Sequence, residues 1–166
     1  MTWTNNDGLL IRFASEEAAD TPVGEYGGFD PGSIHLVQLE INPTVLNAVD
    51  KNVYTSVRFP GANSVTCFIA KAEVHVEEAF DSAAEGFTLT IGFDNADGTV
   101  YDADGIDVAI AETALDAVGD VVVCDGARVK TRLDNTQPLY LTTTVGGEVP
   151  TAGKGWVKIW YYLTNE

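Results

Sequence analysis

The chain has 166 residues, of which 25 are acidic and 9 are basic, so its formal net charge is 9 − 25 = −16. This length allows one domain or at most two small ones, and a hydrophobic content of 45% is too high for a disordered acidic segment. Because affinity for a phosphate backbone needs lysine and arginine, the charge argues against a nucleic-acid-binding protein and predicts no nucleic-acid partner.

The N-terminal residues carry no recognisable export signal. Residues 1–8 contain no basic region followed by an apolar run, and no stretch of the chain approaches the roughly 20 apolar residues that span a bilayer. We therefore expect a protein made in the cytoplasm, with no membrane partner. Cys67 and Cys124 lie in apolar runs outside any C-x-x-C pair, which predicts two buried thiols and no zinc or redox motif.

Alternation of apolar and polar residues with a period of two dominates the chain and predicts β-strands with one dry face. In residues 68–77 the even positions are apolar, whereas Lys71, Glu73, His75 and Glu77 are polar. Further strands are predicted, in chain order, at residues 37–41 (ended by Asn42-Pro43), 53–59, 87–93, 139–145 and 156–163, with weaker candidates at 9–13, 121–124 and 127–133.

Residues 106–118 break this alternation. Ile106, Ala109, Ile110, Ala114 and Leu115 have helical spacing, and Gly119 follows as a C-terminal stop. The pattern predicts one short helix, capped at Asp104 or nearby. The sequence as a whole predicts an all-β protein, an antiparallel β-sandwich of the jelly-roll kind with one short helix.

Little in the sequence points to catalysis, a metal or a cofactor. His35 and His75 both fall in predicted strands, and no G-x-S-x-G elbow is present. The acidic segment 94–107 offers oxygens for Ca²⁺ but lacks the EF-hand spacing. We interpret this segment as a loop that turns at Asp97-Gly98 and at Asp104-Gly105. The prediction is a protein that is not an enzyme.

The last predicted strand is apolar or aromatic on both faces. Val157, Ile159, Tyr161 and Leu163 form the set expected in the core, and the other set is Trp156, Lys158, Trp160 and Tyr162. A strand covered on one side only would carry a polar second face. Three covers stay open for the second set: the helix or the N-terminal segment, another subunit, or a sugar stacked on the rings.

The start of the chain, Thr2-Trp3-Thr4-Asn5-Asn6-Asp7-Gly8-Leu9-Leu10-Ile11-Arg12-Phe13, resembles capsid decoration (cement) proteins of tailed bacteriophages. The resemblance continues at Phe59-Pro60-Gly61-Ala62, at Leu89-Thr90-Ile91-Gly92-Phe93 and from Ile106 to Gly119. It implies a β-sandwich body, a homotrimer on the capsid surface of the virion, the major capsid protein as partner, and no catalysis.

Two alternatives stay open beside this resemblance. Residues 1–13 are either an N-terminal arm, anchored by Trp3, Leu10 and Phe13 with Arg12 in an acidic groove, or the first strand of the sandwich. Residues 14–166 are expected to form a single β-sandwich domain. The rival function is a carbohydrate-binding β-sandwich module of a tail fibre or spike, which would use Trp156, Trp160 and Tyr162 to stack on sugars.

Overall fold

A computed structural model of the chain describes residues 2–4, 10–12, 34–46, 59, 65–83, 86–135 and 138–165. These residues fall into two units, one within Met1–Pro31 and one within Gly32–Glu166. In the first unit, β1 (Thr2–Thr4) pairs antiparallel with β2 (Leu10–Arg12). The predicted strand at 9–13 is therefore confirmed for Leu10–Arg12, whereas Phe13 lies outside the described residues.

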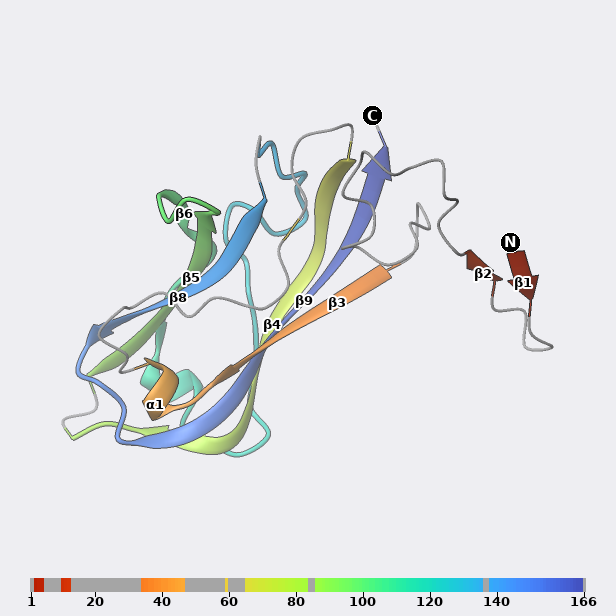
Figure 1. Cartoon of the computed structure of the whole chain (residues 1–166). Coiled ribbons are helices and arrows are strands. Elements are labelled where there is room, and N and C mark those ends of the chain that lie inside the picture. Colours follow the sequence, from red (N-terminus) through yellow and green to blue (C-terminus); the bar gives the residue numbers. More distant parts are fainter. Residues whose placement is uncertain are drawn as a thin grey trace. The chain divides into compact units, whose positions relative to one another are not determined.

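The second unit contains two antiparallel sheets (Figure 1). The four-stranded sheet has the order β3-β9-β4-β7, and the three-stranded sheet has the order β6-β5-β8. The bounds are β3 (Ile34–Ile41), β4 (Val65–Asp81), β5 (Phe87–Asn95), β6 (Val100–Ala111), β7 (Val121–Val123), β8 (Leu139–Gly147) and β9 (Ala152–Asn165). This architecture confirms the predicted all-β sandwich.

The connectivity is that of a jelly roll. β3 belongs to the four-stranded sheet, Phe59 bridges to Leu139 of β8 in the other sheet, and β4 returns to the first sheet. β5 and β6 then join the three-stranded sheet, and β7, β8 and β9 alternate between the two. Of the strand predicted at 53–59, only Phe59 lies within the described residues.

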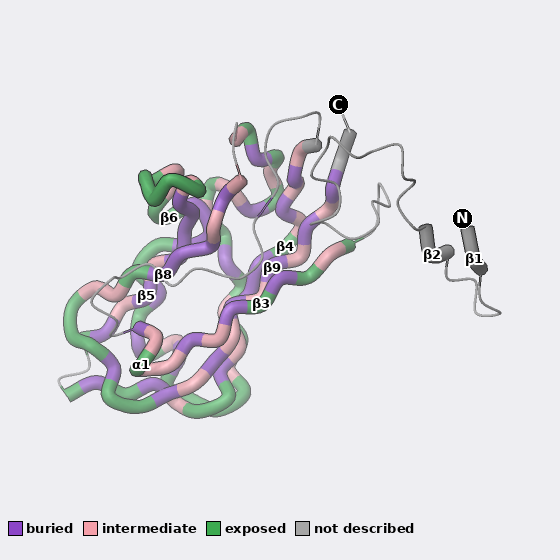
Figure 2. The backbone as a smooth tube through the Cα atoms, in the orientation of Figure 1, coloured by how far each residue is buried: buried purple, intermediate pink, exposed green. Residues whose placement is uncertain are grey.

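The core lies between the two sheets, and Figure 2 shows the buried positions alternating along the strands. Phe59 joins the sheets, because its ring lies 5.2 Å from that of Phe93 and 5.1 Å from that of Tyr161. Cys67 and Cys124 are buried free thiols, as predicted, and burial raises the pKa of both.

A β-bulge in β4 changes which residues face the core. Its pairing with β9 shifts register between Ile69 and Lys71. Before the shift the odd positions Cys67 and Ile69 are buried, and after it the even positions Ala72, Val74 and Val76 are buried. The predicted core positions are therefore correct for Ala72, Val74 and Val76 but wrong for Phe68, which is only half-buried.

The helix predicted at 106–118 is wrong. Residues up to Ala111 belong to β6, and only the 3₁₀ turn Glu112–Ala114 follows. Between Asp107 and Ile110 the register with β5 shifts, and Ala109 adopts φ 51°. This bulge turns both Val108 and Ala109 outward, so buried Ile106 and Ile110 acquire a spacing that imitates a helix. β6 also runs through Gly105, so the predicted turn and cap at Asp104 are absent.

The one α-helix among the described residues is α1 (Pro43–Leu46), which starts where β3 was predicted to stop. Asn42 accepts a hydrogen bond at Oδ1 from the backbone N–H of Val45 (3.0 Å), as an N-cap residue does. Proline suits the first helical position because its missing N–H is not needed there.

Residues 127–133 form turns and not the predicted strand. This segment ties the sheets together. The N–H groups of Gly126 and Arg128 donate to the carbonyls of Ile106 and Gly105 in β6, and further along the chain Leu133 N–H donates to Cys67 O in β4. A second contact to β4 is the bond from Ile69 N–H to Thr131 O (3.0 Å).

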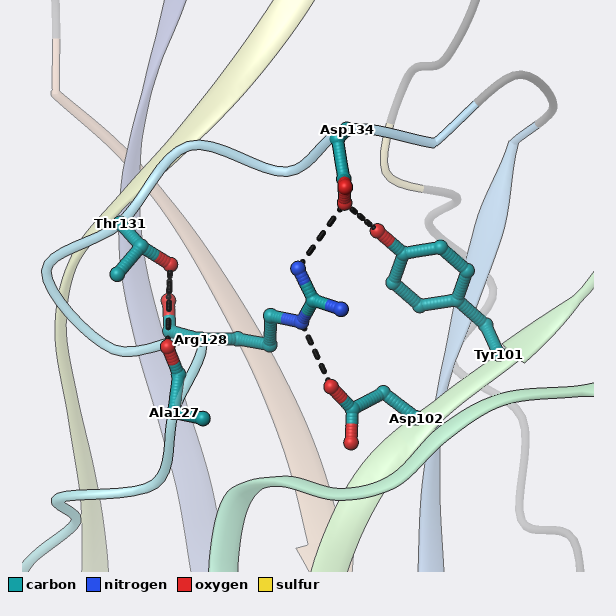
Figure 3. A network of polar contacts seen from close by, with 6 residues as sticks. All are labelled: Tyr101, Asp102, Ala127, Arg128, Thr131 and Asp134. Carbon is teal, nitrogen blue, oxygen red and sulfur yellow. Dashed lines mark hydrogen bonds and ion pairs between the residues drawn. The ribbon is translucent and has the colours of Figure 1, made fainter.

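Arg128 fixes the segment through a polar network (Figure 3). Its Nε donates to Asp102 Oδ2 at 2.6 Å and its guanidinium donates to Asp134 Oδ1 at 3.0 Å. The Tyr101 ring lies 5.1 Å from the guanidinium carbon, and its hydroxyl donates to Asp134. Burial and this hydrogen bond raise the pKa of Tyr101 to about 12, so the phenol stays protonated at neutral pH.

The buried side chain of Ile91 tests the core assignment. Ile91 is fully buried in the centre of β5, so Ile91→Ala is expected to lower the free energy of unfolding by about 2–5 kcal/mol. Val118, which is 73% exposed, provides the control, because Val118→Ala should stay within about 0.5 kcal/mol of the parent. Urea unfolding measures both, and equal losses would contradict the sandwich core.

Gly126 tests the attachment of the segment to β6. A Cβ there would lie 2.5 Å from the backbone carbon of Ile106, so Gly126→Ala is expected to destabilise the protein by about 1–3 kcal/mol. At Gly86 the nearest atom to such a Cβ is 3.8 Å away, and Gly86→Ala is the matched control. A Gly126→Ala protein with the melting temperature of the control would show that the close approach is absent.

Candidate interaction surface

The side chains of the four-stranded sheet that point away from the core form one surface, here called the outer sheet face. The pairing register places these residues level with one another across β3, β9, β4 and β7. They are Ile34, Leu36, Gln38 and Glu40 of β3, Lys154, Trp156, Lys158, Trp160 and Tyr162 of β9, Phe68, Lys71, Glu73 and His75 of β4, and Val121 and Val123 of β7. Glu77 of β4 joins them through its ion pair with Lys154.

β9 divides its side chains as predicted. Val157, Ile159, Tyr161 and Leu163 are buried in the core. Trp156, Lys158, Trp160 and Tyr162 are half-buried and lie in one row on the outer sheet face. The helix that was one of the possible covers is not formed. Trp3, Leu10 and Arg12 belong to the separate β1–β2 unit, in which only the backbone is described, so their predicted role remains a prediction.

Neighbours on β4 support the aromatic row. The Lys71 ammonium lies 5.0 Å from the centre of the Trp160 ring, a distance at which a cation is attracted to an aromatic face. The rings of Phe68 and Tyr162 are 6.3 Å apart, and the indole of Trp156 donates a hydrogen bond to the Glu77 carboxylate. These contacts within the chain therefore fix the positions of the three aromatic side chains without a binding partner.

Glu73 belongs to the outer sheet face but is buried there by its neighbours. Its carboxylate is 2.7 Å from Lys71 Nζ and 3.0 Å from His75 Nε2. Burial opposes ionisation of Glu73, but the hydrogen bonds from Lys71 and His75 outweigh it and lower its pKa. A buried carboxylate needs such partners. The sequence suggested an exposed, polar position here, and this interpretation is wrong for Glu73.

The edges of the outer sheet face carry exposed aliphatic side chains that the sequence analysis did not select. On β3, Ile34 is 58% exposed and Leu36 is 48% exposed; on β7, Val121 is 48% exposed and Val123 is 63% exposed. Two features of the sequence could have revealed these side chains. Residues 34–37 include apolar residues on both faces of the strand, and Val121-Val122-Val123 is a continuous apolar run. Together with the aromatic row, they give this sheet face an exposed apolar patch of the kind that marks interaction sites.

The described residues do not assemble a metal centre. Among them, no group of three or more His, Cys, Asp or Glu side chains is placed to hold a metal ion. His35 stacks on Tyr161 at 5.3 Å, whereas His75 pairs with Glu73 on the outer sheet face, so the two histidines do not act together. In the same part of the chain, no helix has the length and apolar character needed to cross a membrane.

Comparison with known proteins identifies the fold. No protein-family model matches the chain, and no curated protein matches it. Its structure is similar to a chain of the capsid of Ralstonia phage GP4, with a TM-score of 0.55 and 17% identity over 82% of this chain and 88% of that one. It is also similar to a chain in the acidic stable capsid structure of Helicobacter pylori bacteriophage KHP30, with a TM-score of 0.50 and 13% identity over 80% and 90% of the two chains. The fold is thus one that occurs in phage capsids.

The lowered pKa of Glu73 predicts how its contribution to stability depends on pH. The unfolded chain takes up a proton near the ordinary value of 4.5, whereas the folded protein keeps Glu73 ionised to lower pH. Glu73→Gln is therefore expected to lower the free energy of unfolding at pH 7, and the difference from the parent should shrink as the pH falls below about 4.5. Urea unfolding at pH 7 and pH 3 measures it, and a difference independent of pH would contradict the ion pairs.

Proposed function

We propose that this chain is a non-enzymatic structural protein of a phage virion, and specifically a decoration (cement) protein that binds the outer surface of the capsid as a homotrimer. The observation that carries the proposal is the similarity of fold to chains of two phage capsids over four-fifths or more of both partners. The proposed partner is the major capsid protein, and the proposed location is the capsid surface, after synthesis in the host cytoplasm.

The charge and the surfaces of the molecule suit this role. A net charge of −16 favours solubility of the protein before it binds the capsid. A trimer presents three copies of one docking surface, which raises avidity through effective concentration without new contacts. A protein of this kind stabilises the head by bridging neighbouring shell subunits.

The N-terminal residues are the proposed docking arm. Among the described residues, β1 pairs only with β2, and a two-stranded hairpin by itself is only marginally stable in water. Such an arm gains stability by binding to a partner surface. Trp3, Leu10, Arg12 and Phe13 are the residues proposed to contact the shell.

Carbohydrate binding by Trp156, Trp160 and Tyr162 is the less favoured function. Stacking on a sugar needs an open ring face, and the Lys71 ammonium lies over the Trp160 ring at 5.0 Å.

Binding to phage heads tests the proposal. Purified protein mixed with undecorated heads of the phage that encodes it is expected to cosediment with them and to raise their resistance to heat. Arg12→Glu together with Trp3→Ala should weaken cosedimentation at least 10-fold, while Val118→Ser, at a site 73% exposed on the sandwich, should leave it unchanged.

Two results would speak against a decoration protein. Failure of the unmodified chain to add to matching heads would remove the proposed partner. Binding to a glycan array that is lost in Trp160→Ala would instead favour the carbohydrate-binding function.

A further inference from the structure

Apolar surface on the sandwich is concentrated at the two edges and the centre of the outer sheet face. Leu36 and Ile34 are exposed on the β3 edge, Val123 and Val121 on the β7 edge, and the aromatic row of β9 lies between them. Among the described residues, no strand pairs with the free side of β3 or of β7. The unpaired backbone N–H and C=O groups of a strand edge are a template for pairing with another chain, and exposed aliphatic side chains on that edge favour the association.

The charges of this face favour a second copy of the same chain as the occupant. Copies with a net charge of −16 repel one another over most of their surface. On the outer sheet face each acid has a cation: Glu73 has Lys71, Glu77 has Lys154 at 3.1 Å, and Glu40 also lies in the field of Lys154. Lys158 adds a further positive charge. Two copies therefore meet least repulsion when this face lies in the contact.

The strand directions allow a head-to-tail contact. All neighbours in the four-stranded sheet are antiparallel, so the two edge strands β3 and β7 run in opposite directions. When a second copy is placed beside the first in the same orientation, its β7 lies antiparallel to β3. A contact of this kind joins two different surfaces and closes into a ring when the rotation between copies allows it, and a trimer needs such a contact.

We infer that the copies associate through the outer sheet face, with the β3 edge of one copy against the β7 edge of the next and the aromatic row of β9 turned toward the three-fold axis. This inference rests on the homotrimer of the proposed function. It assigns Leu36 and Val123 to opposite sides of every contact, and it gives Trp156, Trp160 and Tyr162 a cover made of the same residues from the other copies.

Cysteine pairs test the geometry. Leu36→Cys, Val123→Cys and the double variant are treated with a bismaleimide, whose spacer tolerates differences in register, and are analysed on a denaturing gel. Cys67 and Cys124 are buried, so the unmodified chain is the control without cross-links. The double variant is expected to give covalent dimers and trimers, whereas each single variant stays monomeric.

The other outcomes overturn the inference. A dimer from Leu36→Cys alone would show a two-fold β3 contact, and a ladder beyond three copies would show an open filament. A trimer in light scattering without cross-links in the double variant would place the contact elsewhere.

A charge substitution tests the same contact without cross-linking. Leu36→Glu is expected to raise the dissociation constant of the trimer at least 10-fold in light scattering, while Val118→Glu leaves it unchanged. If Leu36→Glu has no effect, the inference fails. The head-binding assay distinguishes failure of the proposed function from failure of this inference. Cross-linked trimers that do not bind heads overturn only the proposed function. Head binding without cross-links overturns only this inference.

Discussion

The mutual burial of two sheet faces is the interaction on which the rest of this molecule depends. The strands β3, β4, β5, β6, β8 and β9 contribute buried aliphatic or aromatic side chains to one layer, and Phe59 contacts both sheets through Phe93 and Tyr161. Because β9 fills its inner positions with Val157, Ile159, Tyr161 and Leu163, its tryptophans must lie on the other side. The outer sheet face therefore follows from the requirements of the core.

The strands and most of the core could be predicted from the sequence, because alternation reports directly which side chains share a face. Where a bulge adds a residue, this signal fails. At Ile69 and Lys71 the bulge exchanges odd and even positions, and at Ala109 it produces a spacing that resembles a helix. Bulges depend on how two strands are paired, and pairing is a property of the whole fold.

The sequence could predict which residues of a single strand belong to the candidate surface, but it could not predict which strands lie side by side. The row Trp156, Lys158, Trp160 and Tyr162 follows from β9 alone, since both of its faces are apolar. Its neighbours on β3, β4 and β7 follow from strand order and register, which a local pattern does not contain. Glu73 shows the same limit: a polar residue in an alternating strand looks solvated until Lys71 and His75 are seen to enclose it.

The position of β9 has a consequence for biosynthesis. This strand comprises residues 152–165, yet it lies between β3 and β4 and pairs with both. Until these residues have left the ribosome, the larger sheet lacks its central strand: β3 has no partner, and β4 can pair with β7 on one side only. Native pairing must therefore wait until translation of the sandwich is essentially finished. Contacts so distant along the chain also close slowly, so newly made copies have a window in which they need protection from aggregation.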